Sequence, residues 1–315
     1  MTLEIAEIED AGTGSKARVL PGLGFNCYSF EASGGGPPVH VLWSAPRFTS
    51  GTERPTRSGI PILFPFAGRI RGTSFQYGGR SFPLEVGDDF GNAIHGFVLN
   101  RQWRVTTHER QRIVGEFQAS LDDPTVLERW PADFLIRVTY EIGANRLRCT
   151  IRVENPDERP LPFTLGTHQY FRIPLGAGGQ AADCRIQVPI EQQWELKGLV
   201  PTGRILPAEV GPKLTEGMPF GDTQLDDVFT GLTYSEGRAT TSIYDPNSHR
   251  TMTMTFDEQF RHCVVFNPPH REAICIEPYT AAPNPFELEE HGIRSGLRTL
   301  APGQSFEAKI DMRVH

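Results

Sequence analysis

Hydrophobic and polar residues alternate one by one along several stretches of this chain. In 146–153 apolar residues hold every second position between arginines and a threonine, and 136–142 shows the same period. A period of two is typical of a β-strand with one buried and one solvated face. The stretch 143–145 (GAN) between them has the composition of a tight turn, so the pattern predicts a hairpin.

The same strand signal recurs elsewhere, without a long helical signal. Gly78-Gly79 separates two short strand-like runs, and 251–256 and 306–314 alternate apolar with mostly polar residues. No long window shows an uninterrupted helical period, although short helical turns fit the sequence near 125–130 and 286–291. Many antiparallel strands joined by Gly/Pro turns predict an all-β fold, either a sandwich or a barrel.

Composition supports that prediction. The 315 residues include 32 Gly and 26 Pro, which suits a turn-rich β protein, and no Ser/Gly linker divides the chain. We therefore expect a single large β domain over 1–315. With 31 Lys and Arg against 38 Asp and Glu, the formal net charge is −7. Neither nucleic acid nor a membrane is expected as a partner, because nucleic acids and anionic membranes attract a basic surface.

Targeting, redox and metal signals are weak. The first ten residues are acidic and unlike a signal peptide, and the longest apolar run, 60–67, is short and broken by Pro, so we expect a cytoplasmic protein. Five widely spaced cysteines fit reduced core thiols better than disulfides. The nine histidines form no closely spaced ligand set and no nucleotide fingerprint is present, so neither a metal nor a cofactor is expected.

Four segments combine ionisable residues with apolar, Gly- and Pro-rich surroundings. In the first, Arg69 follows eight largely apolar residues, so its guanidinium either caps a core edge or projects into a pocket. In the second, His95 stands between Ile94 and Gly96. That context suits a core histidine as well as a pocket donor with close backbone access.

The third and fourth segments carry groups suited to acid–base chemistry. His168 follows a strand-like run and precedes two aromatic residues, and histidine is the commonest acid or base near neutral pH. Glu277 ends a short apolar strand, where burial raises the pKa of a carboxyl towards that of a general base. The alternatives are a buried histidine with a backbone partner and a strand-end glutamate paired with an arginine.

Together and in this order, the four segments resemble the aldose 1-epimerase (galactose mutarotase-like) family. The most specific pieces are 167–171 (THQYF) and 276–278 (IEP), and the His95-Gly96 pair is similar to another family element. Arg69 matches the family arginine, although Gly68 stands where the family has Asn. The resemblance implies a large antiparallel β-sandwich (a supersandwich), an open sugar cleft and a reaction without a cofactor.

The resemblance also implies roles for individual residues in interconverting the α and β anomers of a free aldohexose. Glu277 would take the proton of the C1 hydroxyl, and His168 would donate a proton to the ring oxygen O5 as the ring opens, with both roles reversed on closure. The segment 225–229 (LDDVF) would supply a sugar-binding aspartate, Asp226 or its neighbour Asp227. The residues expected to bind the sugar are Arg69, His95, Asp226 and Tyr170. Further candidates for stacking on the ring are Trp43, Phe66 and Phe266.

Other functions stay open at this point. Arg69 and Arg71, with Arg172, are compatible with phosphate binding and so with a hexose-6-phosphate 1-epimerase. A non-catalytic carbohydrate-binding protein on the same scaffold is expected to lack the acid or the base, and a glycoside hydrolase usually needs two carboxylates. The expected partner is a small-molecule sugar, with the chain a monomer or a homodimer. We expect the imidazole and the carboxylate to face each other across one cleft, spaced for a pyranose.

Overall fold

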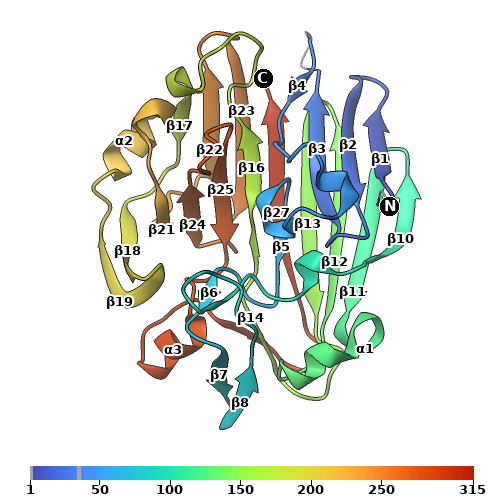
Figure 1. Ribbon diagram of the computed structural model, residues 1–315, viewed down its shortest axis with the longest axis vertical. Coiled ribbons are helices and arrows are strands. Elements are labelled where there is room, and N and C mark those ends of the chain that lie inside the picture. Colours follow the sequence, from blue (N-terminus) through green and yellow to red (C-terminus); the bar gives the residue numbers. More distant parts are fainter. Residues whose placement is uncertain (1–2, 34–36) are drawn as a thin grey trace.

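Antiparallel β-sheet dominates the fold. The structure is a computed structural model that describes residues 3–33 and 37–315. Two large sheets carry most of the strands, and four smaller sheets complete the described part (Figure 1). The all-β prediction is confirmed.

The first large sheet has nine strands in a non-sequential order. The C-terminal strand lies between strands from the middle of the chain, so the sheet depends on pairings between distant segments. In spatial order the strands are β10 (Arg104–Glu109), β11 (Arg112–Gln118), β12 (Leu135–Gly143), β13 (Arg146–Glu154), β27 (Ser305–Val314), β23 (Arg250–Asp257), β22 (Arg238–Asp245), β17 (Arg185–Gln187) and β20 (Met218–Pro219).

The second large sheet has eight strands, and β25 at its centre pairs with three of them. In spatial order these are β19 (Val200–Pro207), β18 (Gln192–Lys197), β21 (Asp226–Thr230), β24 (His262–Phe266), β25 (Ala273–Tyr279), β15 (Gly166–Thr167) and β5 (Ile62–Leu63), with β16 (Gln169–Arg172) also beside β25.

Short elements make up the rest. A four-stranded sheet contains β1 (Ala6–Asp10), β2 (Ser15–Leu20), β3 (Asn26–Ala32) and β4 (Val39–His40). Three two-stranded sheets pair β6 (Arg69–Ile70) with β9 (Ala93–Ile94), β7 (Ser74–Tyr77) with β8 (Arg80–Pro83), and β14 (Leu161–Phe163) with β26 (Arg298–Leu300). The α-helices are α1 (Ala119–Asp122), α2 (Gly211–Glu216) and α3 (Pro285–Glu290). The 3₁₀ helices are η1 (Phe48–Ser50), η2 (Pro55–Arg57), η3 (Val98–Asn100), η4 (Pro124–Glu128), η5 (Ala181–Asp183) and η6 (Phe220–Asp222).

The predicted hairpins and short helical turns are present. Strands β12 and β13 pair along their whole length, from Leu135 opposite Glu154 to Gly143 opposite Arg146. The turn residues Ala144 and Asn145 have φ of 53° and 58°, the left-handed conformation of tight hairpin turns. Gly78-Gly79 likewise joins β7 to β8, and η4 and α3 occupy the two predicted helical stretches.

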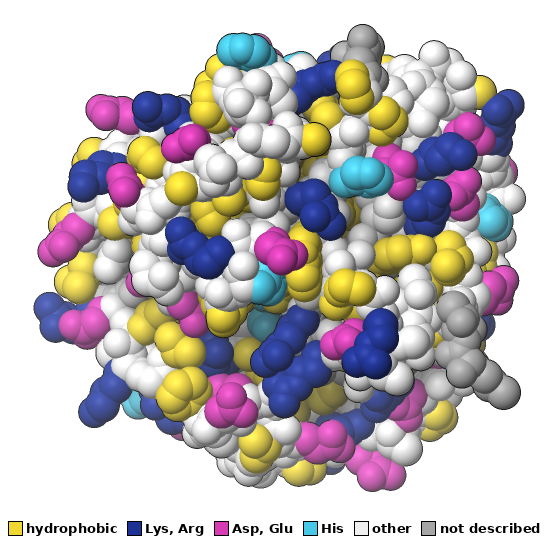
Figure 2. Space-filling view, turned by 45° about the horizontal axis from the view of Figure 1, so that its top comes forward, with side chains coloured by type: hydrophobic (Ala, Val, Ile, Leu, Met, Phe, Trp, Pro, Cys, Tyr) yellow, Lys and Arg dark blue, Asp and Glu magenta, His cyan; other side chains and the backbone are white. Residues whose placement is uncertain are grey.

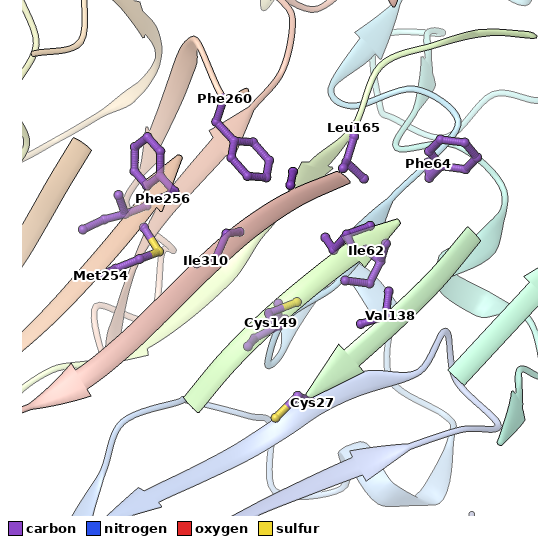
Figure 3. Close-up of a cluster of buried hydrophobic side chains, with 14 of the residues drawn as sticks. Cys27, Ile62, Phe64, Val138, Cys149, Leu165, Met254, Phe256, Phe260 and Ile310 are labelled. Carbon is purple, nitrogen blue, oxygen red and sulfur yellow. The ribbon is translucent and has the colours of Figure 1, made fainter. Parts of the chain in front are cut away.

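The main hydrophobic core lies between the two large sheets, as expected for a β-sandwich. Figure 3 shows Val138 of β12, Cys149 of β13 and Ile310 of β27 close to Ile62 of β5. These side chains are fully or almost fully buried because alternate residues of each strand point to this interior. The antiparallel sandwich predicted from the sequence is therefore confirmed.

Two further observations concern the described residues. All five cysteines are buried and free, as the spacing predicted. No helix within 3–33 or 37–315 has the length and apolar character needed to cross a membrane.

Candidate active site

The central strands of the eight-stranded sheet divide their residues between two faces. In β25, Ile274 and Ile276 point into the main core, so Cys275, Glu277 and Tyr279 point to the opposite face. That face lies away from the nine-stranded sheet, and it packs against residues of loops and short helices such as Ala67, Leu99 and Leu288. A charged group on it is therefore withdrawn from bulk water without entering the main core.

Strand register brings His168 and Glu277 into contact. Strand β16 pairs with β25 so that Tyr170 lies opposite Cys275, which puts His168, two residues before Tyr170, beside Glu277. His168 Nε2 lies 3.2 Å from Glu277 Oε1. His168 is 7% and Glu277 1% exposed, so the contact is almost completely shielded from solvent.

Burial controls the charge of this pair. It raises the pKa of Glu277 well above its usual range, and it lowers the pKa of His168. Both shifts favour the uncharged forms, a carboxylic acid and a neutral imidazole. The two groups then share one titratable proton, which lies on the carboxyl group. An imidazolium beside a carboxylate has the same total, with that proton on the imidazole instead.

Tyr279 holds the other carboxyl oxygen. Its hydroxyl donates a hydrogen bond of 2.8 Å to Glu277 Oε2. The tyrosine ring lies close against Gly166 of β15, which has no side chain: a Cβ there would come within 2.6 Å of Tyr279 Cδ1. Glu277 is thus fixed at both oxygens, and only the Oε1 side is in contact with the histidine.

A short two-stranded sheet brings Arg69 and His95 to the same place. Arg69 of β6 pairs with Ile94 of β9, the residue before His95. His95 itself has φ of 67° and Gly96 φ of 75°. A Cβ on Gly96 would lie 2.1 Å from the Phe64 carbonyl oxygen, so only glycine allows this close approach. His95 is 8% exposed, and its Nδ1 has no hydrogen-bond partner in the structure.

Asp88 orients Arg69. Arg69 Nε donates a 2.8 Å hydrogen bond to Asp88 Oδ2. The backbone N–H groups of Phe90 and Asn92 donate to Asp88 Oδ1, and Asn92 Nδ2 donates to Oδ2. These bonds lower the pKa of Asp88 against the effect of its burial, so its carboxylate stays ionised beside the guanidinium.

Two adjoining cavities open above these residues. The inner one, of about 100 Å³, is lined by the pair and four further ionisable side chains, Arg69, His95, Asp226 and Tyr279. The outer one, of about 430 Å³, shares Arg69, His95 and His168 with it. The space-filling view shows a hollow on this side of the molecule, bordered by histidine and by Lys or Arg side chains (Figure 2). Together the cavities have the size and the few converging polar groups of a small-molecule site.

A model of the aldose 1-epimerase family matches residues 19–313 of the chain. The chain belongs to this family. Among curated relatives, the uncharacterised Escherichia coli K12 protein YphB is 24% identical in an alignment of 312 positions that covers 93% of this chain and 97% of YphB. The plasmid protein LacX of Lactococcus lactis is 25% identical over 153 residues, 47% of this chain and 46% of LacX.

Solved structures agree on the fold of the family. A galactose mutarotase-like protein from Clostridium acetobutylicum superposes with a TM-score of 0.86 at 22% identity, covering 100% of this chain and 99% of the other. A GalM/aldose epimerase homologue from Caenorhabditis elegans gives 0.81 at 16% identity, covering 99% and 98%. At these identities the likeness establishes the galactose mutarotase-like fold.

Within this epimerase-family chain, most residues predicted for the site lie together. His168, Glu277, Arg69, His95 and Asp226 line the inner cavity. Of the two neighbouring aspartates, Asp226 lines it and Asp227, on the other face of β21, does not. One expectation was wrong: the imidazole and the carboxylate touch, so no pyranose fits between them.

The aromatic candidates differ in how much ring surface they offer. Tyr170 lines the outer cavity, but one face of its ring is stacked on His168, with centroids 4.8 Å apart and planes within 5°. Trp43 lines neither of the two cavities and stacks on His270. Phe66 lines the outer cavity but is 1% exposed. Phe266 is partly exposed and lines both cavities, so it is the best-placed ring for a ligand.

The arginines considered for a phosphate are dispersed. Arg71 Nε pairs with the Glu287 carboxylate at 2.9 Å, away from both cavities. Arg172 lines a separate cavity beside Pro174. Of the three arginines, only Arg69 lies in the candidate site.

Two residues that shape this site, Asp88 and Tyr279, were not predicted from the sequence. Asp88 lies in a polar loop whose composition is that of an ordinary surface turn. Tyr279 follows Glu277 by two residues, and the period of two could have placed it on the same face.

The glycine beside His95 gives a stability prediction. Gly96→Ala should lower the free energy of unfolding by roughly 3 kcal/mol, because it adds a steric clash to a left-handed backbone. Gly178→Ala is the matched control, because φ there is 80° but no atom lies within 4 Å of the added Cβ, so about 1 kcal/mol is expected. Urea denaturation of both variants measures the difference, and equal losses would contradict the clash.

Proposed function

We propose that this chain is an aldose 1-epimerase that interconverts the α and β anomers of a free aldohexose. The observation that carries the proposal is the buried contact of His168 Nε2 with Glu277 Oε1 in a cavity also lined by Arg69, His95 and Asp226. An acid and a base that face one small polar cavity are the equipment that ring opening requires.

The contact suits the two oxygens that exchange a proton in this reaction. Opening a pyranose removes the proton from O1, forms the C1–O1 double bond, breaks the C1–O5 bond and adds a proton to O5. O1 and O5 are both bonded to C1, so they lie close enough to hydrogen-bond to two groups in mutual contact. A sugar is therefore expected to approach the pair with its C1 edge, rather than lie between the two side chains.

One proton is enough for the whole cycle. Glu277, as the carboxylate, takes the O1 proton while His168, as the imidazolium, gives its proton to O5. After rotation about the C1–C2 bond, closure on the other face of the carbonyl returns a proton from O5 to His168 and from Glu277 to O1. The ionised pair needed at the start differs from the uncharged pair only by transfer of the shared proton across the 3.2 Å contact.

The remaining residues would bind and orient the sugar. Arg69 and His95 are positioned to donate hydrogen bonds to hydroxyls or to O5, and Asp226 to accept hydrogen bonds from hydroxyls. The orphaned Nδ1 of buried His95 supports a ligand contact, because buried polar atoms normally have a partner. Phe266 would provide an apolar surface for one face of the ring.

Replacing either member of the pair should abolish most of the catalysis. Glu277→Gln and His168→Ala are each expected to lower the rate of mutarotation by about 10²- to 10⁴-fold after the spontaneous rate is subtracted. Polarimetry or NMR exchange between anomers measures it for a panel of aldoses and hexose 6-phosphates. Glu287→Gln, which removes a carboxylate paired with Arg71 outside the cavities, serves as the control.

The panel also separates the competing functions. A folded wild-type protein that binds sugars but accelerates none of them would be a carbohydrate-binding protein, and the proposal would be wrong. Acceleration restricted to phosphorylated sugars would make it a hexose-6-phosphate 1-epimerase. The dispersal of Arg71 and Arg172 away from the site gives that alternative no support from those two side chains.

Asp88 is predicted to act on the sugar through Arg69. Asp88→Asn keeps the shape of the side chain but removes the charge that holds Arg69. Because charge-assisted hydrogen bonds contribute about 1.5–3 kcal/mol, KM should rise by about tenfold, with a smaller change in kcat. Asp222→Asn removes the same charge at an exposed side chain outside both cavities and is the control. Steady-state kinetics and thermal unfolding test this together. A fall in stability with KM unchanged would show that Asp88 only holds the loop.

A further inference from the structure

A cluster of three different metal-binding side chains lies beside the inner cavity, and two of them, His168 and Glu277, line it. His168, Cys275 and Glu277 each offer one ligand atom, and these atoms lie within 4.8 Å of one another. All three residues are buried, at 7%, 0% and 1% exposure. Sequence spacing could not reveal the set, because one ligand comes from the segment before β16 and the other two from β25.

The sheet itself sets the geometry of the cluster. Cys275 and Glu277 are two residues apart on one strand and therefore share a face. Tyr170, opposite Cys275 in the neighbouring strand, fixes where His168 lies. Ligand atoms on a central strand and beside it need little reorganisation to bind an ion, which lowers the cost of binding.

We propose that His168, Cys275 and Glu277 form a binding site for a zinc ion that reversibly blocks this active site. Zinc accepts imidazole nitrogen, thiolate sulfur and carboxylate oxygen at about 2.0–2.3 Å, with four ligands in a tetrahedron. Those bond lengths separate neighbouring ligand atoms by roughly 3.3–3.8 Å. The 3.2 Å between His168 Nε2 and Glu277 Oε1 is close to this requirement, and the thiol sulfur of Cys275 lies within 4.8 Å of a ligand atom of each partner.

The charges of the cluster also balance. On binding, a divalent ion displaces one proton from the thiol of Cys275 and one from the carboxyl of Glu277, and both protons leave to solvent. The buried site therefore gains the two positive charges of the ion and loses the two positive charges of the protons, so its net charge does not change. Burying a charge without such compensation would be costly.

The cluster selects against hard cations. Mg²⁺ and Ca²⁺ require six or more oxygen ligands, whereas this set offers one oxygen, one nitrogen and one sulfur. Three protein ligands leave a fourth position for water, and the inner cavity adjoining His168 and Glu277 provides the space. A bound zinc ion engages the same Nε2 and carboxylate atoms that the proposed reaction needs. Inhibition therefore rests on the proposed function, whereas binding of the ion does not.

Cys275 distinguishes this site from general zinc binding to a catalytic His–Glu pair. Cys275→Ala and Cys275→Ser should weaken zinc binding by at least about tenfold, because the soft ligand is lost. Cys263→Ala is the matched control: it removes a fully buried thiol from the adjacent strand β24, where it belongs to the main core. Thermal unfolding of all three variants verifies that they are folded.

The experiment titrates metal-free protein with Zn²⁺ by calorimetry and with Co²⁺ by absorption spectroscopy. We expect one equivalent of Zn²⁺ to bind with micromolar or tighter affinity, and Co²⁺ to give a thiolate charge-transfer band in the near ultraviolet. The band should persist in Cys263→Ala and disappear in both Cys275 variants. Wild type without the band, or Cys275 variants with unchanged zinc affinity, would overturn the site.

Mutarotation assays then separate the site from the proposed function. Zn²⁺ should inhibit in competition with the sugar, a chelator should restore the rate, and Mg²⁺ or Ca²⁺ should have no effect. Cys275-dependent zinc binding by a protein without mutarotase activity would refute the function and leave the site standing. Mutarotation that zinc at saturation does not inhibit would refute the block and leave the proposed function standing.

Discussion

The contact between His168 and Glu277 depends on keeping two ionisable groups out of water in fixed positions. Desolvation penalises charge on both, so the sheet must hold them close enough to share a proton. A β-sheet meets this demand through its register, since one slip of β16 against β25 would turn His168 to the opposite face. The main core, packed against the other face of the sheet, opposes such a slip.

The remaining features of the site follow from that position. The pair lies on a sheet face that packs against loops and short helices, so its other partners come from outside the sheet. Tyr279 reaches Glu277 because Gly166 leaves room for its ring, and Arg69 reaches the cavity from β6 with its guanidinium held by Asp88. Gly96 allows the chain at His95 to pass against the Phe64 carbonyl. Glycine is thus required where two backbone segments, or a ring and a strand, come closest.

Local pattern was sufficient for individual strands but not for their arrangement. The period of two identified β12, β13 and β23 and the turn between the first two, because burial of one face is recorded in consecutive residues. Strand β27 lies between β13 and β23, so it pairs with segments that are distant in the sequence. The alternation within one strand carries no information about such pairings. The resemblance to a family supplied the architecture that the pattern could not.

The sequence predicted those site residues whose chemical type is unusual among their neighbours in the chain. His168 and Glu277 are of this kind because ionisable groups in apolar strands are unusual, whereas Asp88 resembles any loop aspartate and acts only through a contact 19 residues away in sequence. Cys275 was interpreted as one of several core thiols. It is buried like the others, but it also lies beside His168 and Glu277, and only the strand register relates these two properties. A metal site whose ligands come from adjacent segments of a sheet, such as the proposed one, has no short sequence spacing that would reveal it.

The same compact arrangement explains why a sugar and a metal ion would compete for this site. The proposed mutarotation would return the protein to its starting protonation state, so a pair that shares a single proton would suffice. Contact between the two groups would shorten every proton transfer. Groups that are close, fixed and shielded from water are also what a tetrahedral metal ion needs. A thiol on the next residue of the same face completes such a set at little cost to acid–base chemistry, because burial raises the pKa of Cys275 well above its usual range and keeps it protonated. The same close, fixed placement of His168 and Glu277 would thus serve both proton transfer and zinc binding. Cys275 differs between the two uses, because it would bind zinc but takes no part in the proposed proton transfer.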